Sequence, residues 1–130
     1  SASIALDYIR ANAGRFKIKN EIFEKTDIHI HVPEGAVPKD GPSAGVTMTT
    51  ALVSCLSDTP VRSDVAMTGE VTLRGNVLPI GGLNRSGVST VIIPKGNVKD
   101  LDDIPESVKE SMEFVPVERV TQVLDVALVR

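Results

Sequence analysis

One serine lies where a loop rich in glycine and proline meets a predicted helix. Residues 38–45 read Pro-Lys-Asp-Gly-Pro-Ser-Ala-Gly, and apolar residues at helical spacing follow over residues 46–56. This pattern predicts Ser43 in the first helical turn, where unpaired backbone N–H groups favour negative charge and can hold the oxyanion of a tetrahedral intermediate. Ser43 is therefore our candidate nucleophile for a hydrolytic reaction. The same residue types also fit a helix N-cap.

The order of histidine and serine along the chain excludes one common class of serine hydrolase. Residues 41–45 satisfy Gly-x-Ser-x-Gly, the nucleophile elbow of α/β-hydrolases, which carry the catalytic histidine after the serine. The two histidines of this chain, His29 and His31, both precede Ser43, and they alternate with apolar residues in a way that predicts a surface or structural role. Without a histidine in position, the base most often paired with serine is lysine.

A lysine base must be largely desolvated. Its pKa has to fall from about 10.4 to roughly 7–8, which corresponds to about 4 kcal/mol. Lys39 stands beside Asp40, whose charge favours the protonated ammonium. Lys95 and Lys99 follow a predicted strand in a polar segment and are expected to be solvated. None of these lysines suits the role.

Three longer motifs give the serine loop a context. They are residues 38–45, then Ala-Met-Thr-Gly-Glu-Val-Thr-Leu-Arg-Gly at 66–75, and Val-Leu-Pro-Ile-Gly-Gly-Leu at 77–83. In this order they resemble the proteolytic domain of the Lon family of ATP-dependent proteases, and the resemblance extends through residues 27–35 and 100–105 to the C-terminus. It implies an α/β (α+β layered) fold, in which a mixed sheet packs against helices.

The resemblance also implies roles for particular residues. Ser43 matches the nucleophile of a serine–lysine dyad, and Asp40, Gly41, Thr68 and Glu70 match supporting positions near the site. The hydroxyl of Thr68 is expected to hydrogen-bond the lysine amine. From residue type alone, Asp40 and Glu70 also suit turns, and Thr68 suits strand packing.

The dyad lysine itself is missing from the sequence. After Gly-Gly-Leu the family continues with Lys-Glu-Lys and a helix, whereas here Leu83 is followed directly by Asn84. Residues 77–80 and 90–93 both predict strands, and if they are parallel neighbours their crossover requires about a dozen residues, more than the nine at 81–89. We therefore hypothesise that the polypeptide carries a lysine-containing segment between Leu83 and Asn84.

Composition favours one domain over residues 1–130. The chain is 42% apolar with a net charge of −3 and interleaved charges, which argues against disorder and against nucleic acid as a partner. No apolar run is long enough for a membrane span, and no export signal opens the chain, so we expect no membrane association. The single cysteine, Cys55, lies in the apolar run and is expected to be buried, with no disulfide or metal role.

Periodicity and turn residues predict the elements. We expect helices over residues 4–13, 46–56, 97–104 and 120–128, and strands over residues 27–32, 65–70, 71–80, 90–94 and 113–117, with a hairpin turn at 74–76 and an edge position for the strand that contains Pro116. Met48 and Met67 are expected to fill the core.

Three functions remain open on the sequence. The first is a serine endopeptidase that hydrolyses unfolded polypeptides within a homo-hexamer, with ATP and Mg²⁺ bound by an ATPase module outside this chain and no cofactor in this domain. The second is an inert Lon-like assembly module without its lysine, and the third is an anion-binding module at the helix start. The family implies the bacterial cytoplasm, with the mitochondrial matrix as the alternative. The chain contains no Gly-x-x-x-x-Gly-Lys-Ser/Thr loop for ATP, and we expect it to be an N-terminally truncated piece of a longer protein.

Overall fold

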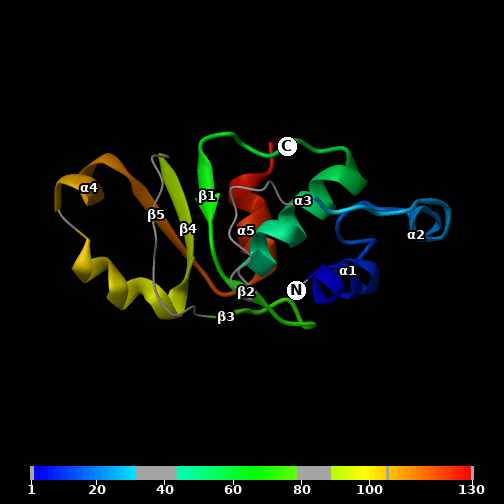
Figure 1. Cartoon of the computed structure of the whole chain (residues 1–130), viewed down its shortest axis with the longest axis horizontal. Coiled ribbons are helices and arrows are strands. Elements are labelled where there is room, and N and C mark those ends of the chain that lie inside the picture. The colour runs from blue at the N-terminus through cyan, green and yellow to red at the C-terminus, as the bar shows by residue number, and fades with distance from the viewer. Residues whose placement is uncertain (1, 32–43, 79–88, 105, 130) are drawn as a thin grey trace.

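The structure is a computed structural model that describes residues 2–31, 44–78, 89–104 and 106–129. Helices and strands alternate along much of the chain, and helices lie on both sides of the central strands (Figure 1). The elements are α1 (Ala2–Ala11), α2 (Glu21–Lys25), α3 (Gly45–Ser57), β1 (Val65–Met67), β2 (Glu70–Val71), β3 (Val77–Leu78), β4 (Thr90–Pro94), the 3₁₀ helix η2 (Lys95–Asp103), α4 (Glu106–Ser111), β5 (Glu113–Val117) and α5 (Val120–Ala127).

Three parallel strands form the central sheet in the order β1-β4-β5. The middle strand β4 is buried along its whole length, and Ile92 and Ile93 are fully inaccessible. A short run of β-branched apolar residues favours this position, because both faces of a central parallel strand are covered. Among the described strands, β5 lies at the edge of the sheet, as predicted. Pro116 has no N–H to donate to a neighbouring strand, and an edge strand tolerates this loss.

β2 and β3 form a separate antiparallel pair, in register at Glu70 with Leu78 and at Val71 with Val77. The predicted hairpin turn is confirmed, and Gly75 closes it with φ +82° and an N–H donated to Thr72 O at 2.9 Å. A side chain at Gly75 would overlap the ring of Tyr8 on α1, so only glycine lets the hairpin approach this helix.

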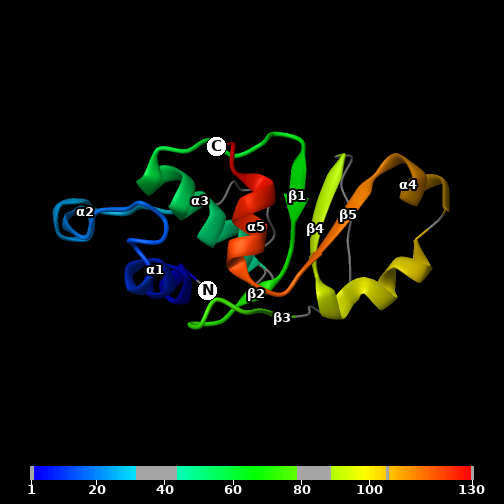
Figure 2. The same cartoon turned by 180° about the vertical axis from the view of Figure 1, so that it is seen from behind.

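Helices α1, α3 and α5 pack together around the main core (Figure 2). In α5 the buried residues recur at helical spacing, so one stripe faces the core while the opposite face meets solvent. These residues are Val120, Val123, Leu124 and Ala127. Met48 and Met67 are partly buried against the same core, as predicted. η2 and α4 lie at the end of the molecule opposite α1 and α2 (Figure 1).

Two predictions about strands are wrong. β3 pairs with β2, whereas β4 lies between β1 and β5, so the strands at 77–78 and 90–94 are not parallel neighbours. The crossover length between them is therefore no argument for missing residues. The described part of the predicted strand at 27–32, residues 27–31, is extended but joins no sheet in the described part of the chain.

The prediction for Cys55 is also wrong. Its side chain is exposed on the outer side of α3, because the stripe of α3 that faces the core contains Val46, Thr49, Leu52 and Val53 instead. In the described ranges no helix is long and apolar enough to cross a membrane.

Candidate active site

The sequence-predicted site residues fall into two groups. Asp40, Gly41 and Ser43 lie outside the described residues, as does the junction between Leu83 and Asn84. Thr68 and Glu70 are described and both are half-buried. The described part of the candidate site consists of the start of α3, which follows Ser43 directly in the chain, and the connection that carries Thr68 and Glu70.

Among the described residues, no side chain caps the start of α3. Ala44 precedes the helix with φ −84° and ψ −1°, and its methyl side chain accepts no hydrogen bond from the first N–H groups of the helix. One of them, the N–H of Val46, donates to the carbonyl of Gly69 at 3.1 Å. This donor is used in a protein contact, so the N–H of Val46 is not available to an oxyanion or another anion.

The connection between β1 and β2 runs against this helix start. Thr68 follows β1 and donates its N–H to Ile92 O at 3.2 Å, which extends the parallel ladder by one bond. Gly69 then turns the chain with φ +150°, and Glu70 begins β2 opposite Leu78. The strand predicted over residues 65–70 is thus interrupted, because the backbone at Thr68 and Gly69 leaves one sheet and enters the other.

Thr68 lies at the carboxyl end of β1. In open parallel sheets, ligand and catalytic sites form outside the carboxyl ends of the strands. The first turn of α3 contacts the β1–β2 connection at this end of the sheet, through the hydrogen bond from Val46 N–H to Gly69 O. The structure therefore brings Thr68 and Glu70 to the helix start that Ser43 precedes.

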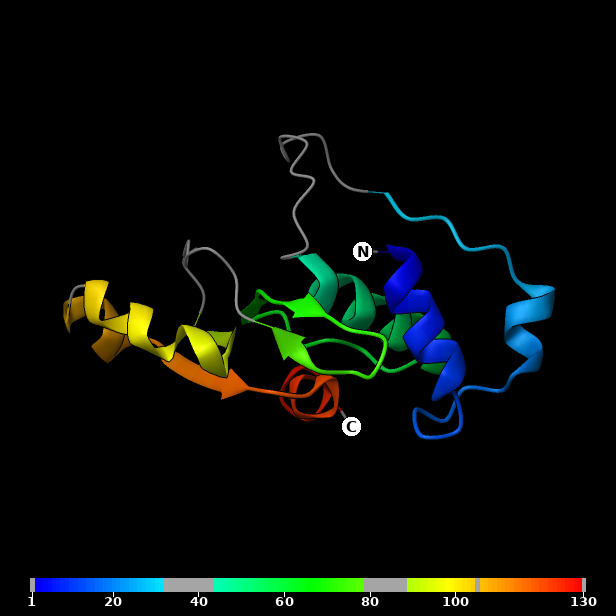
Figure 3. The ribbon, with the colours of Figure 1, turned by 90° about the horizontal axis from the view of Figure 1, so that it is seen from below.

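An open groove of about 600 Å³ lies beside α3. One wall is the extended segment 26–31, which passes outside the helices (Figure 3), and the other is the outer side of α3, including Ala51 and Cys55. Ala44 lines the groove as well, so the groove reaches the residue next to Ser43. Its mainly apolar lining suits an extended polypeptide segment with apolar side chains.

The two histidines and the two described lysines that the sequence excludes from catalysis are exposed, as predicted. His29 and His31 are exposed, as expected. Lys95 is solvated and pairs with Glu118 at 3.1 Å, and Lys99 is exposed, which is the opposite of what a desolvated base requires. Among the described residues, no group of three or more His, Cys, Asp or Glu side chains could hold a metal ion.

Gly45 and Gly69 were missed as site residues by sequence reasoning. Both glycines allow close backbone contact between α3 and the β1–β2 connection. The first position of a helix accepts the backbone of any residue. A glycine there is therefore a local sign that space for a side chain, and not backbone conformation, is restricted.

Comparison with known proteins identifies the family. The sequence profile described as Lon protease (S16) C-terminal proteolytic domain matches residues 1–130. The chain is 58% identical to a Lon protease of Brevibacillus choshinensis over all of its own length and 18% of the relative's. It is 61% identical to a Lon protease of Mycoplasmopsis agalactiae, over 95% of this chain and 13% of that protein, and 57% identical to Lon protease 1 of Myxococcus xanthus, over 99% and 17%.

The alignment with the Brevibacillus protein is longer than this chain. The Brevibacillus alignment runs over 137 positions against the 130 residues of this chain, which leaves seven positions without a counterpart here. The chain spans less than a fifth of each of these relatives. At this identity over its whole length, the chain belongs to the family of Lon protease C-terminal proteolytic domains.

Proposed function

We propose that residues 1–130 are a single proteolytic domain of a longer Lon-type protease, which hydrolyses peptide bonds of unfolded polypeptides through an acyl-enzyme on Ser43. The observation that carries the proposal is the family match over the whole chain. The contact between the start of α3 and the Thr68–Glu70 connection supports it, because this helix start follows Ser43 directly in the chain.

The general base in this proposal is a lysine between Leu83 and Asn84. The seven additional positions in the alignment with the Brevibacillus relative support a segment that this sequence lacks. Peptide mapping by mass spectrometry across the junction tests the idea. We expect a peptide in which a lysine-containing segment follows Leu83, and a peptide that runs from Leu83 directly into Asn84 would refute the segment.

The reaction would proceed in two steps. Ser43 Oγ attacks the carbonyl carbon while the neutral lysine amine takes the hydroxyl proton, and the oxyanion is held by backbone N–H groups around Ser43. The C–N bond then breaks as the lysine ammonium returns its proton to the leaving amine. In the second step, the lysine amine takes a proton from the attacking water and returns it to Ser43 Oγ as the ester C–O bond breaks, which releases the acid and restores the serine.

The supporting residues would act on this pair. Thr68 Oγ1 accepts a hydrogen bond from the lysine ammonium and so holds the amine toward Ser43. Asp40, Gly41 and Glu70 shape the surroundings of the dyad. Such positioning matters because a misplacement of about 1 Å can cost about 100-fold in rate.

The longer protein supplies the rest of the proposal. We propose that an ATPase module, which binds ATP and Mg²⁺, delivers unfolded polypeptide to a homo-hexamer of this domain in the bacterial cytoplasm. The short span of the chain on its relatives supports the presence of further modules in them.

Replacement of Ser43 tests the function. Ser43→Ala in the full-length protein should abolish ATP-stimulated cleavage of an unfolded polypeptide and labelling by a fluorophosphonate. Ser63→Ala is the matched control, because Ser63 is an exposed turn residue outside the site. Unlabelled Ser43 in a folded, assembled wild type would favour the second function, an inert assembly module, which the absence of the lysine from the printed sequence also favours.

A further inference from the structure

Two glycines set how closely α3 approaches the β1–β2 connection. A Cβ atom on Gly45 would lie 2.9 Å from the backbone nitrogen of Val71 and 3.3 Å from the carbonyl oxygen of Gly69. The first of these distances is shorter than real Cβ contacts, and both neighbours are backbone atoms that cannot rotate away. Only glycine at position 45 permits this separation.

Gly69 is restricted from the opposite side. Its φ of +150° is unfavourable for other residues, and a Cβ atom there would lie 2.7 Å from Val77 Cγ1 and 3.3 Å from atoms of Pro94 and Val46. The connection is therefore held between α3, β3 and the end of β4. It has little freedom to move away from the helix without losing contacts on its other side.

A hydrogen bond joins the same two segments. The N–H of Val46, in the first turn of α3, donates to Gly69 O at 3.1 Å. We call the contact of Gly45 and Val46 with Gly69 and Val71 the glycine seam. It combines close packing with a directional bond, so it determines both the separation and the orientation of the two segments.

We propose that the glycine seam is a positioning device for the peptidase site: it fixes the start of α3, which follows Ser43 in the chain, against the connection that carries Thr68. The inference rests on the proposed function. Ser43 is two residues before Gly45, so their Cα atoms are within about 7.6 Å, and Thr68 is bonded directly to Gly69, with Cα atoms about 3.8 Å apart. A change in the seam is therefore passed to both residues over short, covalently fixed distances.

The size of the expected effect follows from the geometry. An alanine at position 45 needs about half an ångström of extra separation to bring its 2.9 Å contact to the 3.4 Å of an ordinary one. Because a 1 Å misplacement costs about 100-fold, we expect about a tenfold loss in kcat. Alanine is otherwise the better helix former, so a loss cannot come from helix propensity.

The experiment uses the full-length protein and three alanine variants. Gly45→Ala and Gly69→Ala are compared with the control Gly14→Ala, because a Cβ atom on Gly14 meets nothing within 4 Å. The readouts are kcat and KM for a fluorogenic peptide, the rate constant of Ser43 labelling by a fluorophosphonate, and the thermal midpoint. We expect kcat and the labelling rate to fall in the two seam variants while KM stays within about twofold, and no change in the control.

A rescue separates positioning from stability. The double variant Gly69→Ala/Val77→Ala removes the 2.7 Å overlap and should recover part of the labelling rate lost in Gly69→Ala, even though Val77→Ala leaves a cavity that lowers the thermal midpoint. Folded seam variants with wild-type kcat and labelling rate would overturn the proposal. An inactive, unlabelled wild type would instead overturn the proposed function, so the two failures are distinguishable.

Discussion

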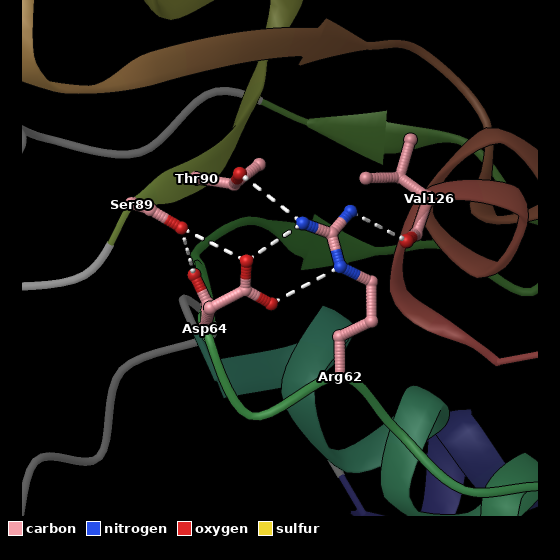
Figure 4. A network of polar contacts seen from close by, with 5 residues as sticks. All are labelled: Arg62, Asp64, Ser89, Thr90 and Val126. Carbon is pink, nitrogen blue, oxygen red and sulfur yellow. Dashed lines mark hydrogen bonds and ion pairs between the residues drawn. The ribbon is translucent and has the colours of Figure 1, made fainter.

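The guanidinium of Arg62 donates two hydrogen bonds to the carboxylate of Asp64, at 3.1 and 2.8 Å (Figure 4). Asp64 also accepts from Ser89 Oγ at 2.9 Å, and its backbone carbonyl accepts the N–H of Thr90 at 3.2 Å. The N–H of Arg62 donates to Ala127 O at 2.8 Å. These bonds join the segment before β1 to the start of β4 and to the end of α5.

This arrangement predicts a pH dependence of stability. The hydrogen bonds from Arg62 and Ser89 lower the pKa of Asp64 from 3.8 to about 2. A lowered pKa in the folded state means that the ionised carboxylate stabilises the fold above pH 4, and that this contribution is lost as the pH falls through 2. Thermal midpoints of wild type and Asp64→Asn, measured from pH 7 to pH 2, should therefore differ at neutral pH and converge near pH 2.

The exposed Asp102 provides the control for this experiment. Asp102→Asn removes one exposed carboxylate elsewhere on the surface and so reports the effect of a lost negative charge alone. A gap between wild type and Asp64→Asn that persists unchanged at pH 2 would show that the charge of Asp64 is not the stabilising feature.

Gly75→Ala should strongly destabilise the fold. The φ of +82° costs an L-residue about 1–2 kcal/mol, and the added methyl group overlaps the Tyr8 ring, which is 1% exposed. We expect a loss of about 3 kcal/mol in the free energy of unfolding, measured by urea titration. Gly14→Ala is the matched substitution in open space and should change this free energy by less than about 1 kcal/mol, so equal losses in the two variants would contradict the argument.

Tyr8→Phe should be neutral or stabilising. Tyr8 Oη is buried and makes no hydrogen bond of good geometry among the described residues. The guanidinium groups of Arg15 and Arg119 lie near it, but they compensate only in part for the water that the hydroxyl has lost. Loss of the hydroxyl should raise the free energy of unfolding by up to about 1 kcal/mol in urea titration. A loss of more than this amount would reveal a hydrogen bond that the hydroxyl makes in solution.

The same tyrosine can be followed by absorbance, because it is the only one in the chain. Burial raises the pKa of Tyr8 above 10, and the positive charges of Arg119 and Arg15 oppose this only in part. In the folded protein, tyrosinate absorbance should therefore appear at a higher pH than in urea. Coincident titration curves would contradict the burial.

Local pattern was sufficient to predict several elements. Strand β4 is a β-branched run of only five residues, which favours a strand, and α5 repeats apolar residues at helical spacing, which favours a helix. The five-residue helix α2 was missed, because a single turn carries no periodicity. The neighbours of β3 and β4 were assigned wrongly, because strand pairing depends on contacts between distant segments rather than on the strands' own residues.

The candidate site was predictable to the same extent. Family motifs indicate Ser43, Thr68 and Glu70 directly. The proposed role of Gly45 and Gly69 depends on how closely two separate segments approach, and the sequence gives only one local sign of this distance, the glycine at the first position of α3.

Cys55 provides a direct test of the outer side of α3. The sequence predicts burial because the whole stretch is apolar, but the helix turns Cys55 outward, where it lines the groove and is exposed. Cys55 should therefore react with a maleimide in the native protein, at a rate within about tenfold of that in urea, as followed on the peptide that contains it, and Cys55→Ser should abolish the labelling of this peptide. Protection of more than about 100-fold in the native state would mean that opening of the structure limits access. The groove beside α3 would then be covered in solution.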